Sequence, residues 1–197
     1  MSPLVRYEIR DRVAVVTIDN PPVNALSAGV MEGISDAVER GDDDADADAI
    51  VLIGAGTTFI AGADINIFKE LKTREQSIER SQAVHARLKQ LEDAGKPLVA
   101  AIHGHALGGG LEFAMACHYR VAVATARVGQ PEVQLGIIPG AGGTQRLPRL
   151  CGVPLALDMC TDGKMITARA RHRPAFSTLL SMATCWKAQS PLRGRVR

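Results

Sequence analysis

The chain has 197 residues, of which 46% are hydrophobic and 22% are charged. This balance is typical of a globular domain with a sizeable core, and it excludes a wholly disordered chain and a collagen-like repeat. A net charge of +2 and an aromatic content of 4% argue against nucleic acid or a membrane as a partner.

The cysteines and the first residues indicate the cellular setting. The four cysteines show no CxxC pair and no histidine at zinc-finger spacing. We therefore expect a reduced, cytoplasmic protein without a metal site. The chain begins without the apolar segment of a secretory signal, and no apolar stretch is long enough to span a bilayer.

Strands and helices are predicted to alternate along the chain. Short apolar runs indicate strands, and apolar residues that recur on one face indicate helices. The expected strands are residues 4–10, 13–18, 49–53, 98–102 and 120–124. The expected helices are residues 27–40 with Ser27 as the N-cap, residues 75–94 with Val84, Leu88 and Leu91 facing inward, and a helix opened by the glycines at 108–110 that ends near residue 117. This order predicts an α/β fold.

Two charged stretches are interpreted without a binding function. The aspartate-rich run at 42–48 lacks the glycine and closing glutamate of an EF-hand, so we interpret it as a solvated turn. Residues 1–163 hold 15 basic and 21 acidic side chains, whereas residues 164–197 hold 8 basic and none that are acidic. We therefore divide the chain into a folded body at 1–163 and an atypical basic tail at 164–197 that is expected to be poorly ordered. An arm that binds nucleic acid is the alternative for this tail.

Three glycine-rich segments hold the candidate functional residues. The glycines at 108–110 stand where a helix begins, so unpaired N–H groups and the positive end of the helix dipole would stabilise a developing oxyanion there. Glu112, in the first turn, also has a purely structural interpretation, because an acid there stabilises the dipole by about 0.3–1 kcal/mol. Glu132 follows a proline and has the alternative interpretation of a surface acid. From these residues alone, the structural interpretation of both glutamates is favoured.

The three segments, in their order and spacing, resemble the crotonase family, also called the enoyl-CoA hydratase/isomerase superfamily. They read IAGADI at 60–65, IHGHALGGGLE at 102–112 and VGQPEVQLGIIPGAGG at 128–143, and IDNPPVNAL at 18–26 belongs to the same pattern. The resemblance covers about residues 4–163 and is especially strong to the hydratase domain of multifunctional fatty-acid β-oxidation proteins. It implies a spiral of ββα units that assembles as a homotrimer or hexamer.

The resemblance also implies the residues of the site. The thioester carbonyl of an acyl-CoA substrate would lie between the backbone N–H groups of Ala63 and Gly109. The two catalytic glutamates would be Glu112 and Glu132, which reverses the structural interpretation above. The loop that wraps the CoA moiety would contain Ala61, Asp64 and Ile65.

The implied activity is the hydration of 2-enoyl-CoA to 3-hydroxyacyl-CoA in fatty-acid β-oxidation. Glu132 would act as general acid and base at the α-carbon, and Glu112 would position and help activate the water. No metal or redox cofactor is expected, because CoA is part of the substrate. The alternative is Δ3–Δ2-enoyl-CoA isomerisation, which needs one glutamate and the same oxyanion hole.

The chain departs from the family pattern after residue 164. Family members continue with acidic, alanine-rich helices that close the acyl pocket and build the trimer, whereas this chain continues with ARARHRP at 168–174. We therefore expect a chain that is C-terminally truncated or frameshifted relative to the family. A crotonase-like protein without activity is the corresponding non-enzymatic alternative.

Overall fold

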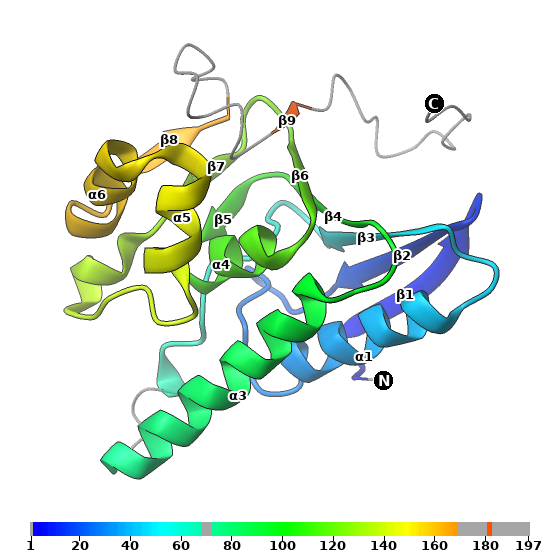
Figure 1. Cartoon of the computed structure of the whole chain (residues 1–197), viewed down its shortest axis with the longest axis horizontal. Coiled ribbons are helices and arrows are strands. Elements are labelled where there is room, and N and C mark those ends of the chain that lie inside the picture. The colour runs from blue at the N-terminus through cyan, green and yellow to red at the C-terminus, as the bar shows by residue number, and fades with distance from the viewer. Residues whose placement is uncertain (1, 68–71, 169–180, 183–197) are drawn as a thin grey trace.

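The computed structural model of the chain describes residues 2–67, 72–168 and 181–182 (Figure 1). In chain order its elements are β1 (Val5–Arg10), β2 (Val13–Ile18), α1 (Val30–Asp43), β3 (Ala49–Gly54), α3 (Arg74–Glu92), β4 (Leu98–Ile102), β5 (His105–Leu107), α4 (Gly109–Ala116), β6 (Tyr119–Ala122), β7 (Arg127–Gly129), the 3-10 helix η1 (Pro131–Leu135), α5 (Gly143–Cys151), α6 (Val153–Thr161), β8 (Met165–Thr167) and β9 (Ser181–Met182).

The strands form two sheets. The larger has the order β1-β2-β3-β4-β6-β9, with β1 and β2 antiparallel and the following neighbours parallel. The smaller has the order β5-β7-β8. An isolated bridge between Ile60 and Ala106 joins the segment after β3 to β5. The chain likewise passes from the larger sheet to the smaller one where β5 follows β4 and where β7 follows β6. The α/β fold expected from the sequence is confirmed.

The helices enclose a core beside the larger sheet (Figure 1). Helix α1 packs on β1, β2 and β3, and α3 packs beside α1 and α4. Ile34, Ile50, Leu52, Leu88 and Leu91 are completely buried here. Burying such a side chain stabilises the fold by about 1.5–3 kcal/mol. The core therefore holds α3 and α4, which border the candidate site.

The N-terminus of α1 differs from the sequence prediction. The helix begins at Val30, and its N-cap is Gly29 rather than Ser27. The Ser27 hydroxyl instead accepts a hydrogen bond from Asn20 Nδ2 at 3.0 Å, so it is engaged before the helix starts. The Glu32 carboxylate caps the helix by accepting the Gly29 N–H at 2.8 Å.

Helix α3 has the expected position and the expected inward face. It spans Arg74–Glu92, and the Thr73 hydroxyl accepts the Gln76 N–H at its start. Leu88 and Leu91 are buried as predicted, whereas Val84 is only partly buried. Val84 nevertheless packs against the core, so the predicted inward direction of all three side chains is confirmed.

The sequence prediction of an irregular tail from residue 164 does not hold for Met165–Thr167. These residues form β8, which pairs antiparallel with β7. A three-residue strand is too short to show a period in the sequence, and pairing with β7 supplies the hydrogen bonds that keep it extended. Most of the remaining predicted tail lies outside the described residues.

The aspartate-rich run makes specific contacts as well as facing solvent. The Asp42 carboxylate accepts the N–H groups of Gly95 and Lys96, both at 2.7 Å, and Asp44 accepts the Tyr7 hydroxyl at 2.8 Å. Residues 42–48 therefore fasten the end of α1 to β1 and to the segment before β4. In the described part of the chain, no helix is both long and apolar enough to cross a membrane.

Candidate active site

The three candidate segments meet at one cavity of about 740 Å³. Of the seven residues predicted for the site, six line this cavity: Ala61, Ala63, Ile65, Gly109, Glu112 and Glu132. Asp64 is not among the lining residues. Its Oδ1 accepts hydrogen bonds from the backbone N–H and the Nδ2 of Asn66, at 2.9 and 3.0 Å, so it shapes the loop rather than the cavity wall.

Two backbone N–H groups border the cavity from different segments. A Cβ atom added to Gly109 would lie 3.7 Å from the Ala63 nitrogen, which places the two residues beside each other. Leu26 holds the Ala63 segment, since its N–H donates to Gly62 at 2.8 Å and its carbonyl accepts from Asp64 at 3.4 Å. Within the described chain, neither the Ala63 N–H nor the Gly109 N–H donates to a protein acceptor. For Gly109 the reason is its place in the first turn of α4, where N–H groups have no partner inside the helix.

Gly108 connects β5 to α4 in a conformation that favours glycine. Its φ of 51° lies in the left-handed region, and a Cβ atom here would lie 3.1 Å from Glu132 Oε1. A side chain at this position would be strained and would press on the carboxylate. The absence of a side chain thus lets the backbone of the α4 N-terminus approach Glu132 closely.

Glu112 is a fixed, buried carboxylate. Its residue is 2% exposed, and its Oε1 accepts the N–H groups of Ala141 and Gly143 at 2.8 and 2.6 Å. Burial raises the pKa of Glu112 above its ordinary value, while these two N–H groups and the charge of Arg146 act in the opposite direction. A Cβ atom on Gly143 would lie 2.9 Å from Oε1, so this close approach also needs a glycine.

Glu132 is the more accessible of the two carboxylates. It lies in η1 directly after Pro131 and is partly buried. Burial raises the pKa of Glu132 to about 7, and the nearby charge of Glu112 adds to the rise. A carboxyl group with a pKa near neutrality is suited to both giving and taking a proton.

Gln130 is a site residue to which the sequence assigned no role. It is completely buried. In the amide orientation that satisfies its neighbours, its Nε2 donates to Glu132 Oε1 at 2.9 Å and Oε2 at 3.1 Å. The other side of the amide faces Gly143, next to Glu112. A polar amide directly before Pro131 and Glu132 was the available signal, but its burial depends on the fold.

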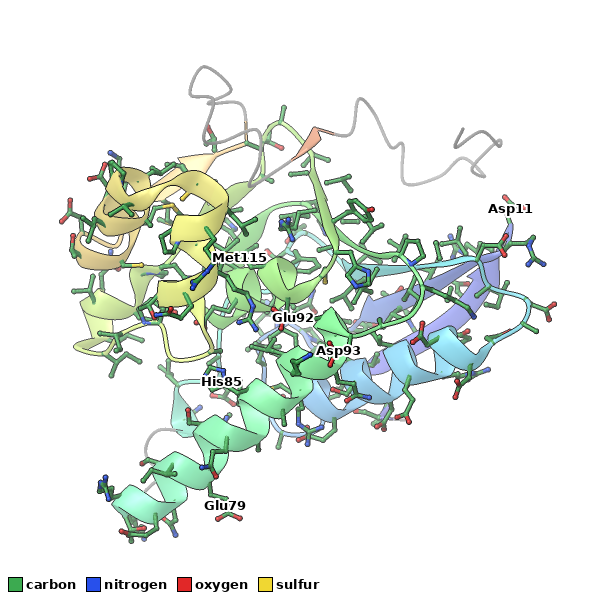
Figure 2. The ribbon with its side chains drawn as sticks, in the orientation of Figure 1. Asp11, Glu79, His85, Glu92, Asp93 and Met115 are labelled. Atoms are coloured by element: carbon green, nitrogen blue, oxygen red, sulfur yellow. The ribbon has the colours of Figure 1, made fainter. Side chains whose placement is uncertain are left out.

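Arg146 joins the site to helix α3. Its Nε donates to Glu92 Oε1 at 2.7 Å, and its Nη1 donates to the carbonyl of Ala141 at 2.9 Å. Figure 2 shows Glu92 near the carboxyl end of α3. Arg146 therefore helps to position Ala141, whose own N–H group donates to Glu112.

The arrangement has the parts for chemistry at a conjugated carbonyl. Two unpaired N–H groups are available to a carbonyl oxygen that gains negative charge. Two carboxyl groups in different environments border the same cavity and are available to hold and deprotonate water. Within the described residues, no group of three or more histidine, cysteine or acidic side chains is placed to hold a metal ion.

Comparison with known proteins adds the relatives of this chain. The profile of the family described as Enoyl-CoA hydratase/isomerase matches residues 8–173. The "Probable enoyl-CoA hydratase" of Bacillus subtilis (strain 168) is 47% identical over 157 residues, which are 80% of this chain and 61% of that protein. The "Peroxisomal fatty acid beta-oxidation multifunctional protein AIM1" of Arabidopsis thaliana is 48% identical over 164 residues, which are 83% of this chain and 23% of that protein.

A solved structure shares the fold. The crystal structure of enoyl-CoA hydratase from Thermoplasma volcanium GSS1 superposes with a TM-score of 0.84 at 29% identity, covering 92% of this chain and 71% of that one. The chain thus spans less than two thirds of the length of the two curated relatives.

Proposed function

Because the chain belongs to the enoyl-CoA hydratase/isomerase family, we propose that it adds water to 2-enoyl-CoA to give 3-hydroxyacyl-CoA. The observation that carries this proposal is the meeting of Glu112 and Glu132 at one cavity beside Ala63 and Gly109. Hydration needs an oxyanion site together with two groups that exchange protons, and this arrangement supplies both.

The oxyanion site would activate the substrate. The thioester oxygen would accept hydrogen bonds from the N–H groups of Ala63 and Gly109, so the β-carbon becomes electrophilic as negative charge moves onto that oxygen. Loss of one such donor in other enzymes lowers the rate by about 10²–10³. Ala61 and Ile65, which line the same cavity, would contact the CoA moiety, and Asp64 would keep their loop in shape.

The two carboxyl groups would then add the elements of water. Glu112 takes one proton from water as the water oxygen bonds to the β-carbon. Glu132 gives its proton to the α-carbon, and the carbonyl double bond re-forms. One proton stays on the pair throughout, having moved from Glu132 to Glu112. The raised pKa of Glu132, about 7, supports its role as the proton donor.

The direct test is an absorbance assay with folded protein. We expect loss of the conjugated-thioester absorbance when 2-enoyl-CoA is supplied. The matched control is Glu79→Gln, because Glu79 is exposed on α3 and does not line the large cavity, and this variant should keep the activity. Folded protein that leaves 2-enoyl-CoA unchanged would refute hydration.

The isomerase alternative is tested in the same assay. Supplied with 3-enoyl-CoA, an isomerase produces conjugated thioester and the absorbance rises. Isomerisation without hydration of 2-enoyl-CoA would replace the proposed function, whereas hydration without isomerisation supports the use of both glutamates.

A further inference from the structure

One wall of the cavity is polar where it meets α3. Ser77, Arg80, Ser81 and Val84 all line the cavity, and their spacing puts them on one face of the helix. They lie on a different element from the loop at 61–65 and from the catalytic glutamates. The rest of the wall is contributed mainly by apolar side chains and glycines, including Leu135, Ile137 and Ile138.

Arg80 is a partly buried cation without a protein partner. In the described part of the chain it forms no ion pair and no hydrogen bond through its side chain. Further along α3, Arg87 is paired with Glu32 at 2.8 Å and Lys89 with Asp93. A charge that loses water without gaining a partner is unfavourable, so Arg80 is poised to accept an anionic ligand group.

The acids near Arg80 form no ion pair with it in the described part of the chain. Glu32 borders a smaller cavity of about 240 Å³ together with Arg80, but its carboxylate already accepts from Arg87 and from the Gly29 N–H. Glu79 borders the same smaller cavity but is exposed to solvent. Arg80 lines the large cavity as well, so a ligand held there borders this cation.

The position of α3 indicates which part of a substrate would reach Arg80. This step rests on the proposed function, in which the thioester lies at Ala63 and Gly109 and CoA follows the loop at 61–65. The acyl chain then extends toward the remaining wall, formed by the α3 face and the segment at 135–138. We propose that Arg80, assisted by the hydroxyl groups of Ser77 and Ser81, binds a carboxylate at the far end of the acyl chain, so that the substrates include enoyl-CoA esters of dicarboxylic acids.

The test measures binding of saturated acyl-CoA esters, which do not react. A series of increasing chain length is titrated into the full chain by calorimetry, each length with and without a terminal carboxylate. At one length we expect the carboxylate to tighten binding about tenfold, as a charge-assisted hydrogen bond does. Arg80→Ala should abolish this preference, and Arg80→Glu should instead favour an ester that ends in an ammonium group.

The control is Arg74→Ala, because Arg74 is an exposed arginine of the same helix that does not line the cavity. It should retain the preference. If Arg80→Ala weakened the binding of all esters equally, Arg80 would be assigned to a CoA phosphate and the proposal would be overturned. The proposal would also be overturned if the wild-type protein bound esters with and without a terminal carboxylate equally at every chain length. Because these esters are not hydrated, a carboxylate preference in a protein without hydratase activity would refute the proposed function and leave this inference standing.

Discussion

At the residue scale, the two glutamates differ in how they are held. Glu112 is buried and fixed by two backbone N–H groups, whereas Glu132 is partly buried and contacts the amide of Gln130. Burial is the main cause of the raised pKa in both. The difference in fixation suits Glu112 to positioning water and Glu132 to moving a proton, which is the division that the family resemblance implies.

The raised pKa of Glu132 predicts a pH-dependent loss of stability. Between its ordinary value of 4.5 and about 7, the folded protein retains a proton that the unfolded chain has lost. The contribution of this group therefore lowers the free energy of unfolding as the pH rises through that window. Glu132→Gln should be more stable than wild type at pH 8, and the difference should shrink at pH 5.

Urea unfolding at both pH values measures this difference. Glu79→Gln serves as the exposed control and should show no comparable change with pH. If Glu132→Gln changed the free energy of unfolding equally at pH 8 and pH 5, the burial of an ionised carboxylate would not be the cause of the change.

Gln130 predicts a shift in the pH dependence of activity. In the proposed mechanism the active form carries one proton on the glutamate pair, so kcat/KM should fall as the pH rises above about 7. The Gln130 amide donates to the ionised form of Glu132 and so favours it. Gln130→Met removes these donors and should move the alkaline limb of the profile to higher pH. A limb that stays in place would show that the amide does not act on this proton.

At the element scale, Arg146 couples α5, α3 and the loop at 139–143. Removing its hydrogen bonds should loosen Ala141, whose N–H group donates to Glu112. We expect Arg146→Met to lower kcat about tenfold, which corresponds to one lost hydrogen bond to a charged group, with a smaller change in KM.

Steady-state kinetics with 2-enoyl-CoA tests this positioning role. Arg146→Lys keeps the charge and should recover part of kcat. If Arg146→Met and Arg146→Lys lowered kcat to the same extent and also destabilised the protein to the same extent, the cause would be a general loss of folding and not the loss of positioning.

The elements also show which local patterns predict structure. The apolar runs of β3 and β4 and the glycines before α4 were sufficient, because each pattern reports local burial or a local turn. Ser27 failed as a cap because Asn20 engages its hydroxyl. Strands β5, β7 and β8 are three residues long and exist only through pairing with distant segments, which no local pattern reports.

At the scale of the whole molecule, the outer side of α6 exposes apolar side chains. Val153 and Leu157 are 60% and 55% exposed, and Leu135 of η1 is 59% exposed. Apolar side chains grouped in this way favour association. We predict concentration-dependent self-association through this face, which Leu157→Asp should weaken in sedimentation velocity. Ile78→Asp, at an exposed apolar position of α3, is the control and should leave the sedimenting mass unchanged. A wild-type chain that stays monomeric at all concentrations would contradict the prediction.

The site illustrates what the sequence could predict about the whole molecule. Six of the seven predicted residues line one cavity, because the order and spacing of the glycine-rich segments already indicated their family. For Gln130 the available signal was only its place before Pro131 and Glu132, and Arg146 and Arg80 carry none. The role of Gln130 depends on its burial, and that of Arg146 depends on its hydrogen bonds to two distant elements. The role of Arg80 depends on having no ion pair in the described part of the chain. All three are properties of the folded chain and not of a local pattern.

The proposed hydration requires that Glu112 and Glu132 act together, one on the water and the other on the α-carbon. Steady-state kinetics of Glu132→Gln, Glu112→Gln and the double variant on 2-enoyl-CoA tests it most directly. We predict that each single substitution lowers kcat by about 10²–10⁴, that the double variant is little worse than the poorer single one, and that KM changes far less than kcat. A Glu132→Gln variant with the wild-type kcat would contradict the claim.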